Sequence, residues 1–311
     1  AVLVASRNRE ELLCKRSIPS ISRQSLQPDL VILVNDGKLI SNQSRMQLET
    51  LCCRTSLRIL ENKRKPGVSG AWNQGIDYLS KRKFRGFVAI LDDDDEWIAT
   101  KLEKQVPLIN SLPKRFGMVY CWMDYFDNGK LVYEHHPVLR GNVFGEVIDK
   151  QRLGGCPTLL IRRSVIHEVG SFDELLPRGN DGDFIRRVCQ KFCVDLVPQV
   201  LVKVHIGHRN KRISDNDSAG LRLHIQSQYF KLQKFRDVLS HYPGPTSSIY
   251  VEIAHSLAKL GEWERSLYFL IKAFSTRSGT SLRFRDFAHI IKTRLRKSVF
   301  PGLSRRSDNI A

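Results

Sequence analysis

The stretch Phe87-Val-Ala-Ile-Leu-Asp-Asp-Asp-Asp-Glu-Trp97 places four consecutive carboxylates directly after an apolar run. The apolar run predicts a buried strand, and the aspartates stand where that strand ends. Adjacent carboxylates repel one another, so the pattern calls for a compensating cation. Oxygen ligands suit Mg²⁺ or Mn²⁺, which proteins commonly share with substrate phosphates. The alternative is a solvated acidic turn that caps the next helix.

Three more short β-rich runs precede this strand, at Val2–Ala5, Val31–Val34 and Leu57–Leu60, and amphipathic stretches such as Glu10–Gln24 and Gly70–Arg82 lie between them. Alternation of strand and helix predicts a parallel sheet with crossover helices. Ligands of an open α/β sheet bind at the carboxyl ends of its strands. We therefore expect the polar residues that follow the four strands to lie together. They are Ser6–Arg9, Asn35–Gly37, Glu61–Lys63 and Asp92–Asp95.

The middle of the chain is less regular, with expected strands at Gly117–Trp122 and Thr158–Ile161 and an expected helix at Asp183–Lys191. From Leu221 onward the apolar spacing is helical. The expected fold class is therefore α/β, followed by a C-terminal helical extension. A polar stretch separates the two parts, which gives a first domain of residues 1–213 and a helical region of residues 214–311.

Composition narrows the class of protein. The chain has 311 residues, of which 41% are apolar and 26% are charged, as in ordinary globular proteins. It carries 50 basic and 32 acidic residues, a net charge of +18. Nine basic residues and one acid lie between Arg277 and Arg306. This excess favours polyanions such as anionic lipid head groups, although a solvated basic tail without a partner is the alternative.

Cysteine usage indicates the redox environment. The chain has seven cysteines and no Cys-x-x-Cys motif, which argues against a disulfide framework. Cys189 and Cys193 lie one helical turn apart without accompanying histidines, so we expect buried thiols rather than metal ligands. We therefore expect the protein to reside in a reducing compartment.

Several segments, in the same order and spacing, resemble family 2 glycosyltransferases of the GT-A fold over about the first 210 residues. They are Val2-Leu-Val-Ala-Ser-Arg-Asn-Arg9, Pro28–Gly37, Gly70-Ala-Trp-Asn-Gln-Gly75, Leu91–Trp97, Gly154-Gly-Cys156, Ile161-Arg-Arg163, Val169–Asp173 and Asn180–Asp183. The resemblance implies a Rossmann-like, mostly parallel sheet with flanking helices. It also implies a metal-dependent inverting enzyme that moves a sugar from a nucleotide-sugar donor to a hydroxyl of a glycan or lipid-linked acceptor. A UDP-sugar is the leading candidate for the donor.

The resemblance further implies a role in cell-surface polysaccharide or glycan synthesis. We expect a cytoplasmic protein with peripheral contact at the inner face of an anionic membrane, and no dedicated nucleic-acid partner.

The same resemblance assigns a set of donor-binding residues. Asp36 can accept from a base N–H or a ribose hydroxyl, and Gly37 lets the backbone turn beside the ligand. Asn73 is expected to bind the sugar-nucleotide side or to brace its loop. The complete nucleotide-sugar set is Ser6, Arg7, Asp36, Gly37, Asn73 and Asp92. The basic run Lys63, Arg64 and Lys65 offers candidates for the diphosphate, or is a solvated charge run.

For the metal ion, magnesium or manganese, the resemblance favours Asp92 and Asp94, with Asp94 the stronger candidate. It also places His205 and His208 where some GT-A enzymes have a further metal or phosphate contact, with ordinary core or surface histidines as the alternative. Trp97 is a candidate for stacking near the acceptor, or else a core residue.

The expected general base is Asp181, which would take the proton of the acceptor hydroxyl. Family enzymes carry this base as the aspartate of an acidic pair before a helix, whereas this chain has Asn180-Asp181. Asp183 is the rival, although it fits better as a helix cap or as a partner of Arg186 or Arg187. Gly155 and Asp183 complete the expected acceptor side.

Two other functions compete with this interpretation. A sugar-phosphate nucleotidyltransferase shares the layout, but its first strand usually leads into a glycine-rich phosphate loop, and residues 6–10 contain no glycine. A nucleic-acid-binding protein would account for the charge, yet no recognition motif accompanies it.

Overall fold

The computed structural model describes residues 1–206 and 217–276, which form two compact units. The first contains Ala1–Val147, Gln151–Leu175 and the chain from Asn180 to the end of the last strand. The second contains Ile148–Lys150, Leu176–Gly179 and the C-terminal helices. The expected boundary at residues 213 and 214 falls outside the described residues and stays a prediction.

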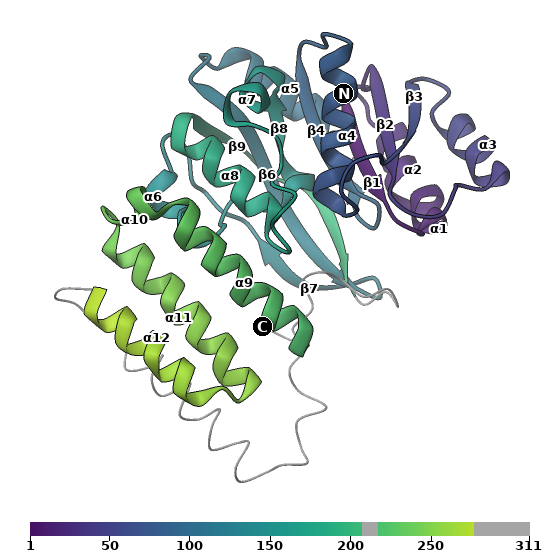
Figure 1. The fold of residues 1–311 in the computed structure, drawn as a ribbon. Helices are drawn as coiled ribbons and strands as arrows, with labels where there is room; N and C mark the ends of the chain where they lie inside the picture. The colour runs from purple at the N-terminus through teal and green to yellow at the C-terminus, as the bar shows by residue number, and fades with distance from the viewer. Residues whose placement is uncertain (207–216, 277–311) are drawn as a thin grey trace. The chain divides into compact units, whose positions relative to one another are not determined.

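The first unit is built on one sheet, whose described strands number nine (Figure 1). Their order is β3-β2-β1-β4-β8-β6-β9-β5, and β7 pairs with β6. The strands β3, β2, β1 and β4 are parallel, β8 is antiparallel to both β4 and β6, and β9 runs parallel to β6. The bounds are β1 Val2–Ser6, β2 Leu30–Asn35, β3 Ser56–Glu61, β4 Phe87–Asp92, β5 Glu96–Trp97, β6 Phe116–Asp127, β7 Lys130–His135, β8 Leu160–Arg162 and β9 Cys193–Ile206.

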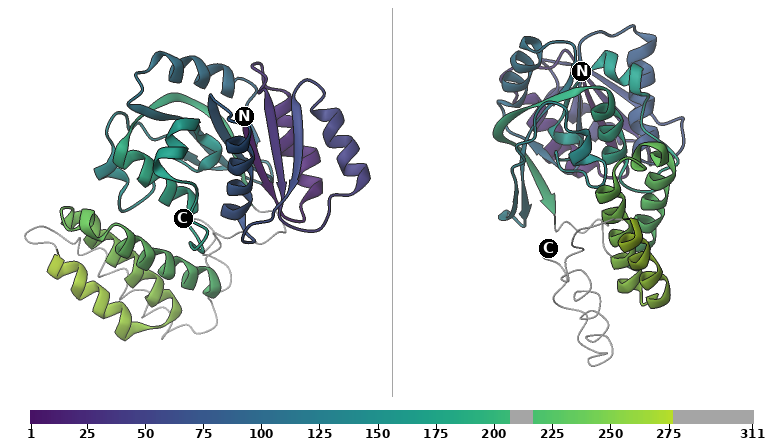
Figure 2. Two further views of the ribbon diagram at one scale, coloured as in Figure 1. Left: turned by 45° about the horizontal axis from the view of Figure 1, so that its top comes forward. Right: turned by 90° about the vertical axis from the view of Figure 1, so that its left-hand side faces the viewer.

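Helices cover both faces of this sheet (Figure 2). Val2 and Val4 join a core with apolar residues of α2, α3 and α5, whereas Leu3 and Val34 face Gly75 of α4 on the other side. The alternation of side chains along each strand thus supplies two cores. The helices of this unit are α1 Glu10–Leu12, α2 Ile18–Ser22, α3 Asn42–Leu51, α4 Val68–Lys81, α5 Lys101–Ser111, α6 Phe144–Val147, α7 Arg163–Val169 and α8 Asn180–Lys191.

The parallel sheet predicted from the first four strands is confirmed. The amphipathic segment expected over Glu10–Gln24 is helical from Glu10 to Ser22, with a π-helical turn at Leu13–Ser17 between α1 and α2. The expected strand at Thr158–Ile161 begins instead as a 3₁₀ turn at Cys156–Thr158, with Pro157 in its first turn, before β8. All seven cysteines are free thiols, and five of them are buried.

The second unit is helical, as the sequence predicts. It contains α9 Ser218–Lys234, α10 Arg236–Leu239, α11 Pro243–Leu260 and α12 Trp263–Thr276. α11 packs against both α9 and α12, and Gly261 joins α11 to α12 in the left-handed conformation, with φ of +83°. In the part of the chain that the structure describes, no helix is both long and apolar enough to cross a membrane. The basic segment Arg277–Arg306 lies outside the described residues.

Candidate active site

The ends of the first four strands lie side by side, as predicted. Ser6 stands opposite Asn35, and Ala5 stands opposite Asp92 on the neighbouring strand. The ladder continues past the strands, because the amide of Asp36 donates to the carbonyl of Ser6 at 2.8 Å. The polar residues after β1, β2, β3 and β4 therefore share one edge of the sheet.

Asp36 is the centre of the contacts on the β1–β3 side. One carboxylate oxygen accepts from the Asn62 side-chain amide at 2.5 Å and the other from the Gly67 amide at 2.8 Å. The exposed guanidinium of Arg7 lies 4.0 Å from the same carboxylate. A Cβ atom on Gly37 would lie 2.4 Å from the Asn8 side-chain oxygen and 3.0 Å from the Asn8 amide nitrogen, so a larger residue there would require Asn8 to shift. The structure thus brings three predicted donor residues, Arg7, Asp36 and Gly37, together.

The acidic turn after β4 is held mainly by arginines. Arg9 donates at 2.9 Å to both Asp93 and Asp94, and Ser6 donates to Asp93 at 2.7 Å. Arg16, from the π-helical turn, donates to the Asp94 carbonyl at 2.8 Å. Arg9 of the chain itself therefore supplies part of the positive charge that the sequence predicts beside these carboxylates. Sequence reasoning missed Arg9 and Arg16, although Arg9 ends the polar run that follows β1.

Three carboxylates of this turn fit a hard divalent cation. Asp92, Asp94 and Asp95 each offer an oxygen, and these atoms lie within 4.8 Å of one another. Burial raises the pKa of Asp92 well above its ordinary value, and the neighbouring carboxylates of Asp93, Asp94, Asp95 and Asp181 raise it further. Such a group is stabilised as an anion by a cation, and an all-oxygen donor set suits Mg²⁺ or Mn²⁺. The chain therefore presents the predicted pair together with Asp95.

A second group of potential ligands lies on the β6–β7 hairpin, where Asp124, Glu134 and His136 converge. His136 lies 2.8 Å from Asp124 and stacks on Trp122, so protein contacts already hold its ring. Its mixed donor set fits Mg²⁺ less well than the turn after β4 does.

Asp181 and Asp183 have different surroundings, although both stand in the first turn of α8. Asp181 accepts from the Gly182 amide at 2.7 Å, and a Cβ atom on Gly155 would lie 3.4 Å from its carboxylate. Burial raises the pKa of Asp181. Asp183 is buried and forms an ion pair with Arg187 at 2.9 Å. The structure thus places Asp181 beside Gly155, and its charge acts on Asp92. Asp183 instead pairs with Arg187, which is one of the two partners that the sequence suggested for it.

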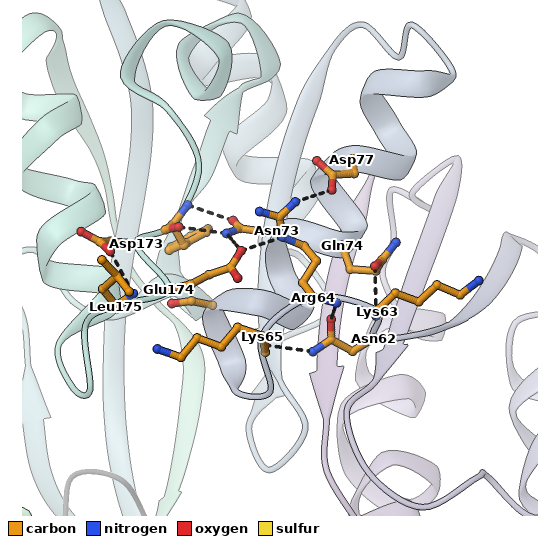
Figure 3. A network of polar contacts seen from close by, with 12 residues as sticks. Asn62, Lys63, Arg64, Lys65, Asn73, Gln74, Asp77, Asp173, Glu174 and Leu175 are labelled. Atoms are coloured by element: carbon orange, nitrogen blue, oxygen red, sulfur yellow. Dashed lines mark hydrogen bonds and ion pairs between the residues drawn. The ribbon is translucent and has the colours of Figure 1, made fainter.

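The residues around Asn73 form a polar network of their own (Figure 3). Asn73 donates to the Phe172 carbonyl at 2.9 Å and to Glu174 at 2.7 Å, and it accepts from the Phe172 amide at 2.9 Å. Arg64 donates to Glu174 at 2.6 Å and to Asp77 at 2.7 Å. This geometry favours bracing over ligand binding for Asn73 and engages Arg64 in ion pairs.

Trp97 and His205 lie at the edges of the predicted site. Trp97 is 2% exposed, and its indole N–H donates to the Pro157 carbonyl at 2.9 Å, which is a core position and not an exposed stacking surface. The amide of His205 donates to Asp95 at 3.2 Å, and its ring lies 3.4 Å from Glu96. Burial and the nearby Arg16 lower the pKa of His205. His208 lies outside the described residues.

Two solved structures have a similar fold. The crystal structure of S. aureus TarS 1-349 in complex with UDP-GlcNAc superposes on this chain with a TM-score of 0.55 at 13% identity. The match covers 91% of this chain and 92% of that one. The mannosyltransferase PcManGT from Pyrobaculum calidifontis, in complex with GDP-Man and Mn²⁺, has a TM-score of 0.53 and 14% identity, covering 96% and 80%. With the mixed sheet and flanking helices, this likeness defines the fold as that of GT-A glycosyltransferases.

The profile of glycosyl transferase family 2 matches residues 1–170, and the chain belongs to that family. It is a glycosyltransferase, as the sequence predicts. An uncharacterized glycosyltransferase of Methanocaldococcus jannaschii is 24% identical over 217 residues, covering 69% of this chain and 73% of that protein.

Two further relatives are matched over smaller shares of their own length. The E. coli enzyme WfgD, a UDP-Glc:alpha-D-GlcNAc-diphosphoundecaprenol beta-1,3-glucosyltransferase, is 30% identical over 132 residues, covering 42% of this chain and 48% of that enzyme. An uncharacterized glycosyltransferase of Rickettsia bellii is 28% identical over 208 residues, and the match covers 64% of this chain but only 29% of that protein.

Proposed function

We propose that this glycosyltransferase moves a sugar from a UDP-sugar to an acceptor hydroxyl with inversion, and that it requires Mg²⁺ or Mn²⁺. The observation that carries the proposal is the approach of Asp181 to the acidic turn. Asp181 belongs to α8 and the turn follows β4, yet the Asp181 charge contributes to the raised pKa of Asp92. A direct displacement needs the carboxylate base and the diphosphate site near the same reacting carbon, and the position of Asp181 is consistent with that need.

The donor side of the reaction is assigned to the ends of β1, β2 and β4. Asp36, with Ser6, Arg7 and Gly37 beside it, would receive the nucleoside. Asp92 and Asp94, with Asp95 as a further ligand, would hold the divalent ion, which as a Lewis acid neutralises the diphosphate leaving group. Arg9 keeps Asp93 and Asp94 in place by its two ion pairs.

Asp181 is assigned the proton transfer. Its carboxylate would accept the proton of the acceptor hydroxyl while that oxygen attacks the anomeric carbon opposite the leaving diphosphate. The raised pKa of Asp181, which burial causes, makes it a stronger base than a solvated aspartate. Gly155, which we assign to the acceptor side, lies next to this carboxylate, since a Cβ atom there would be 3.4 Å from it.

The donor and acceptor classes are supported by similar proteins. TarS is solved with UDP-GlcNAc and PcManGT with GDP-Man and Mn²⁺, and the name of WfgD specifies UDP-glucose and a diphosphoundecaprenol-linked acceptor. We therefore propose a glycan or lipid-linked acceptor and a role in polysaccharide synthesis. Membership in family 2 favours this function over a nucleotidyltransferase or a nucleic-acid-binding protein.

A thermal-shift panel tests donor binding directly. UDP-glucose, UDP-galactose, UDP-GlcNAc and GDP-mannose are each added with MnCl₂, and again with EDTA. A ligand that binds only the folded state raises the melting temperature, so a UDP-sugar should raise it in Mn²⁺ and not in EDTA. Equal melting temperatures under all conditions, together with no release of UDP, would contradict the proposal.

We further propose that the enzyme acts in the cytoplasm at the inner face of a membrane, through the basic segment Arg277–Arg306. Each basic residue near an anionic surface contributes about 1 kcal/mol, so several suffice for salt-sensitive binding. Flotation with vesicles of phosphatidylglycerol and phosphatidylcholine, at low and high salt, measures it. Failure to float at low salt would leave the segment as a solvated tail.

A further inference from the structure

Three consecutive backbone carbonyls next to the active site accept hydrogen bonds from buried side chains. The Trp97 indole N–H donates to Pro157 at 2.9 Å, and the Gln105 amide donates to Thr158 at 2.8 Å. The Lys101 ammonium lies 3.4 Å from the carbonyl of Leu159. The donors come from β5 and α5, and the acceptors span the 3₁₀ turn and the residue after it. We call Trp97, Lys101 and Gln105 the carbonyl clamp.

Lys101 is the unusual member of the carbonyl clamp, because it is fully buried and contacts no carboxylate among the described residues. Its ammonium donates to the Gln105 side-chain oxygen at 2.7 Å and lies 4.1 Å from the centre of the Trp97 ring. Burial lowers the pKa of Lys101 to about 8. A buried ammonium without an anionic partner reduces stability, so the fold of the core does not by itself account for a lysine here.

The clamped segment leads directly to the proposed base. The amide of Thr158 donates to the Gly155 carbonyl at 3.0 Å, and the Thr158 hydroxyl donates to the same carbonyl at 2.8 Å. Gly155 in turn lies against the Asp181 carboxylate. Burial raises the pKa of the neighbouring Cys156 thiol, and the charges of Asp181 and Asp92 raise it further. A displacement of residues 157–159 would therefore move the wall that faces the attacking hydroxyl.

We propose that Lys101, with Trp97 and Gln105, is a positioning residue that fixes the Gly155–Cys156 wall opposite Asp181. This inference rests on the proposed function. The clamp touches neither the donor site at Asp36 nor the carboxylates of Asp92 and Asp94. Its loss should therefore slow turnover while donor binding is kept, because small displacements from productive geometry cost large factors in rate.

The test compares Lys101→Met and Trp97→Phe with wild type. Methionine fills a similar volume without the ammonium, and phenylalanine keeps an aromatic side chain, smaller than indole, without the N–H. Lys104→Met, an exposed lysine on the same helix, is the matched control. Turnover is the release of UDP from UDP-GlcNAc, or from the donor that the panel selects, in Mn²⁺. The affinity for UDP with Mn²⁺ and the melting temperature are measured alongside.

We expect Lys101→Met to lower kcat by about tenfold or more, with Trp97→Phe in the same direction. The UDP affinity should stay within about twofold, and the melting temperature of Lys101→Met should not fall, because a buried charge is removed. Combined with Asp181→Asn, Lys101→Met should add less than about threefold, because a residue that acts through the base loses its effect without it.

Unchanged turnover in both clamp variants would overturn the inference while leaving the proposed function intact. So would a parallel fall of melting temperature, UDP affinity and kcat in both variants, or full additivity with Asp181→Asn. A wild type that releases UDP from no donor in the panel would overturn the proposed function and this inference with it.

Discussion

The two sides of the candidate site are held in place by different means. On the donor side, the residues after β1, β2, β3 and β4 share one edge because the strands are parallel and in register. Polar partners on neighbouring loops then fix each acid, as Asn62 and Gly67 do for Asp36 and Arg9 does for Asp93. On the acceptor side, Asp181 and Gly155 come from a helix start and an irregular loop, and buried side chains reach out of the core to hold that loop.

This difference predicts different consequences for mutation. Loss of a donor-side acid removes a group that a nucleotide or an ion would contact, so binding should weaken. Loss of an acceptor-side group changes the geometry or basicity of the reacting centre, so turnover should fall while binding is kept. Variants on the two sides should therefore separate effects on binding from effects on turnover.

The largest effect is expected for Asp94→Ala on the donor side. The change removes one of three converging carboxylates, and electrostatic stabilisation of a leaving diphosphate is worth several kcal/mol. Turnover should fall by about 10³-fold or more, and the affinity for UDP with Mn²⁺ should fall with it. UDP release and isothermal titration with UDP and Mn²⁺ measure the two effects.

Asp237→Ala, an exposed acid of α10, serves as the control for Asp94→Ala and should behave as wild type. Full activity of Asp94→Ala, or full wild-type activity in EDTA, would remove the metal assignment.

On the acceptor side, Asp181→Asn should lower turnover by about 10²-fold or more, because it keeps the shape of the side chain and removes the base. UDP affinity in Mn²⁺ should stay within about twofold of wild type. Asp183→Asn breaks the ion pair with Arg187 and should lower the melting temperature more than the rate. If Asp183→Asn abolishes turnover and Asp181→Asn does not, Asp183 is the base.

The two sides also differ in how far the sequence predicts them. The donor side follows from local pattern, since apolar runs end in polar residues and parallel strands bring those ends together. The pattern predicted that the acidic turn after Leu91 and the segment Asn35–Gly37 lie at one edge, whereas the family resemblance supplied the donor-binding role of Asp36. The arginine partners of the turn were not, because whether an ion or a side chain compensates a carboxylate depends on tertiary contacts.

The acceptor side depends on contacts that no local pattern carries. Trp97 reads as an aromatic residue beside an acidic motif, yet its partner is a carbonyl 60 residues away. Lys101 and Gln105 are polar residues that no local sequence pattern singles out, and they are buried in the structure, where α5 packs on β6, β8 and β9. The family resemblance, and not hydrophobic periodicity, placed Asp181 and Gly155 in the site.

A smaller effect concerns the core that supports the acceptor side. The pKa of Lys101 is about 8 in the folded protein against 10.5 ordinarily, so between these values the unfolded chain binds more protons than the folded chain. The free energy of unfolding should therefore rise with pH across this window, by up to about 3 kcal/mol relative to Lys101→Met, which lacks the group. Urea unfolding of both proteins at pH 7.5, 8.5 and 9.5, chosen as roughly spanning the window, measures the difference. Parallel pH profiles would show that Lys101 is not a buried ammonium.

The smallest effect tests the residue that joins the two sides. Asn73 extends from α4 on the donor side to the Phe172–Glu174 loop, and its amide pairs with both the N–H and the C=O of Phe172. Asn73→Ala leaves these buried backbone groups unpaired, which should lower the free energy of unfolding by about 2 kcal/mol. If Asn73 only braces the loop, the affinity for UDP with Mn²⁺ should remain within about twofold of wild type. Asn110→Ala, an exposed asparagine of α5, controls for the substitution itself and should change neither quantity. Urea unfolding and titration calorimetry separate the outcomes, since a loss of UDP affinity at unchanged stability would return Asn73 to the donor-binding set that the resemblance assigned.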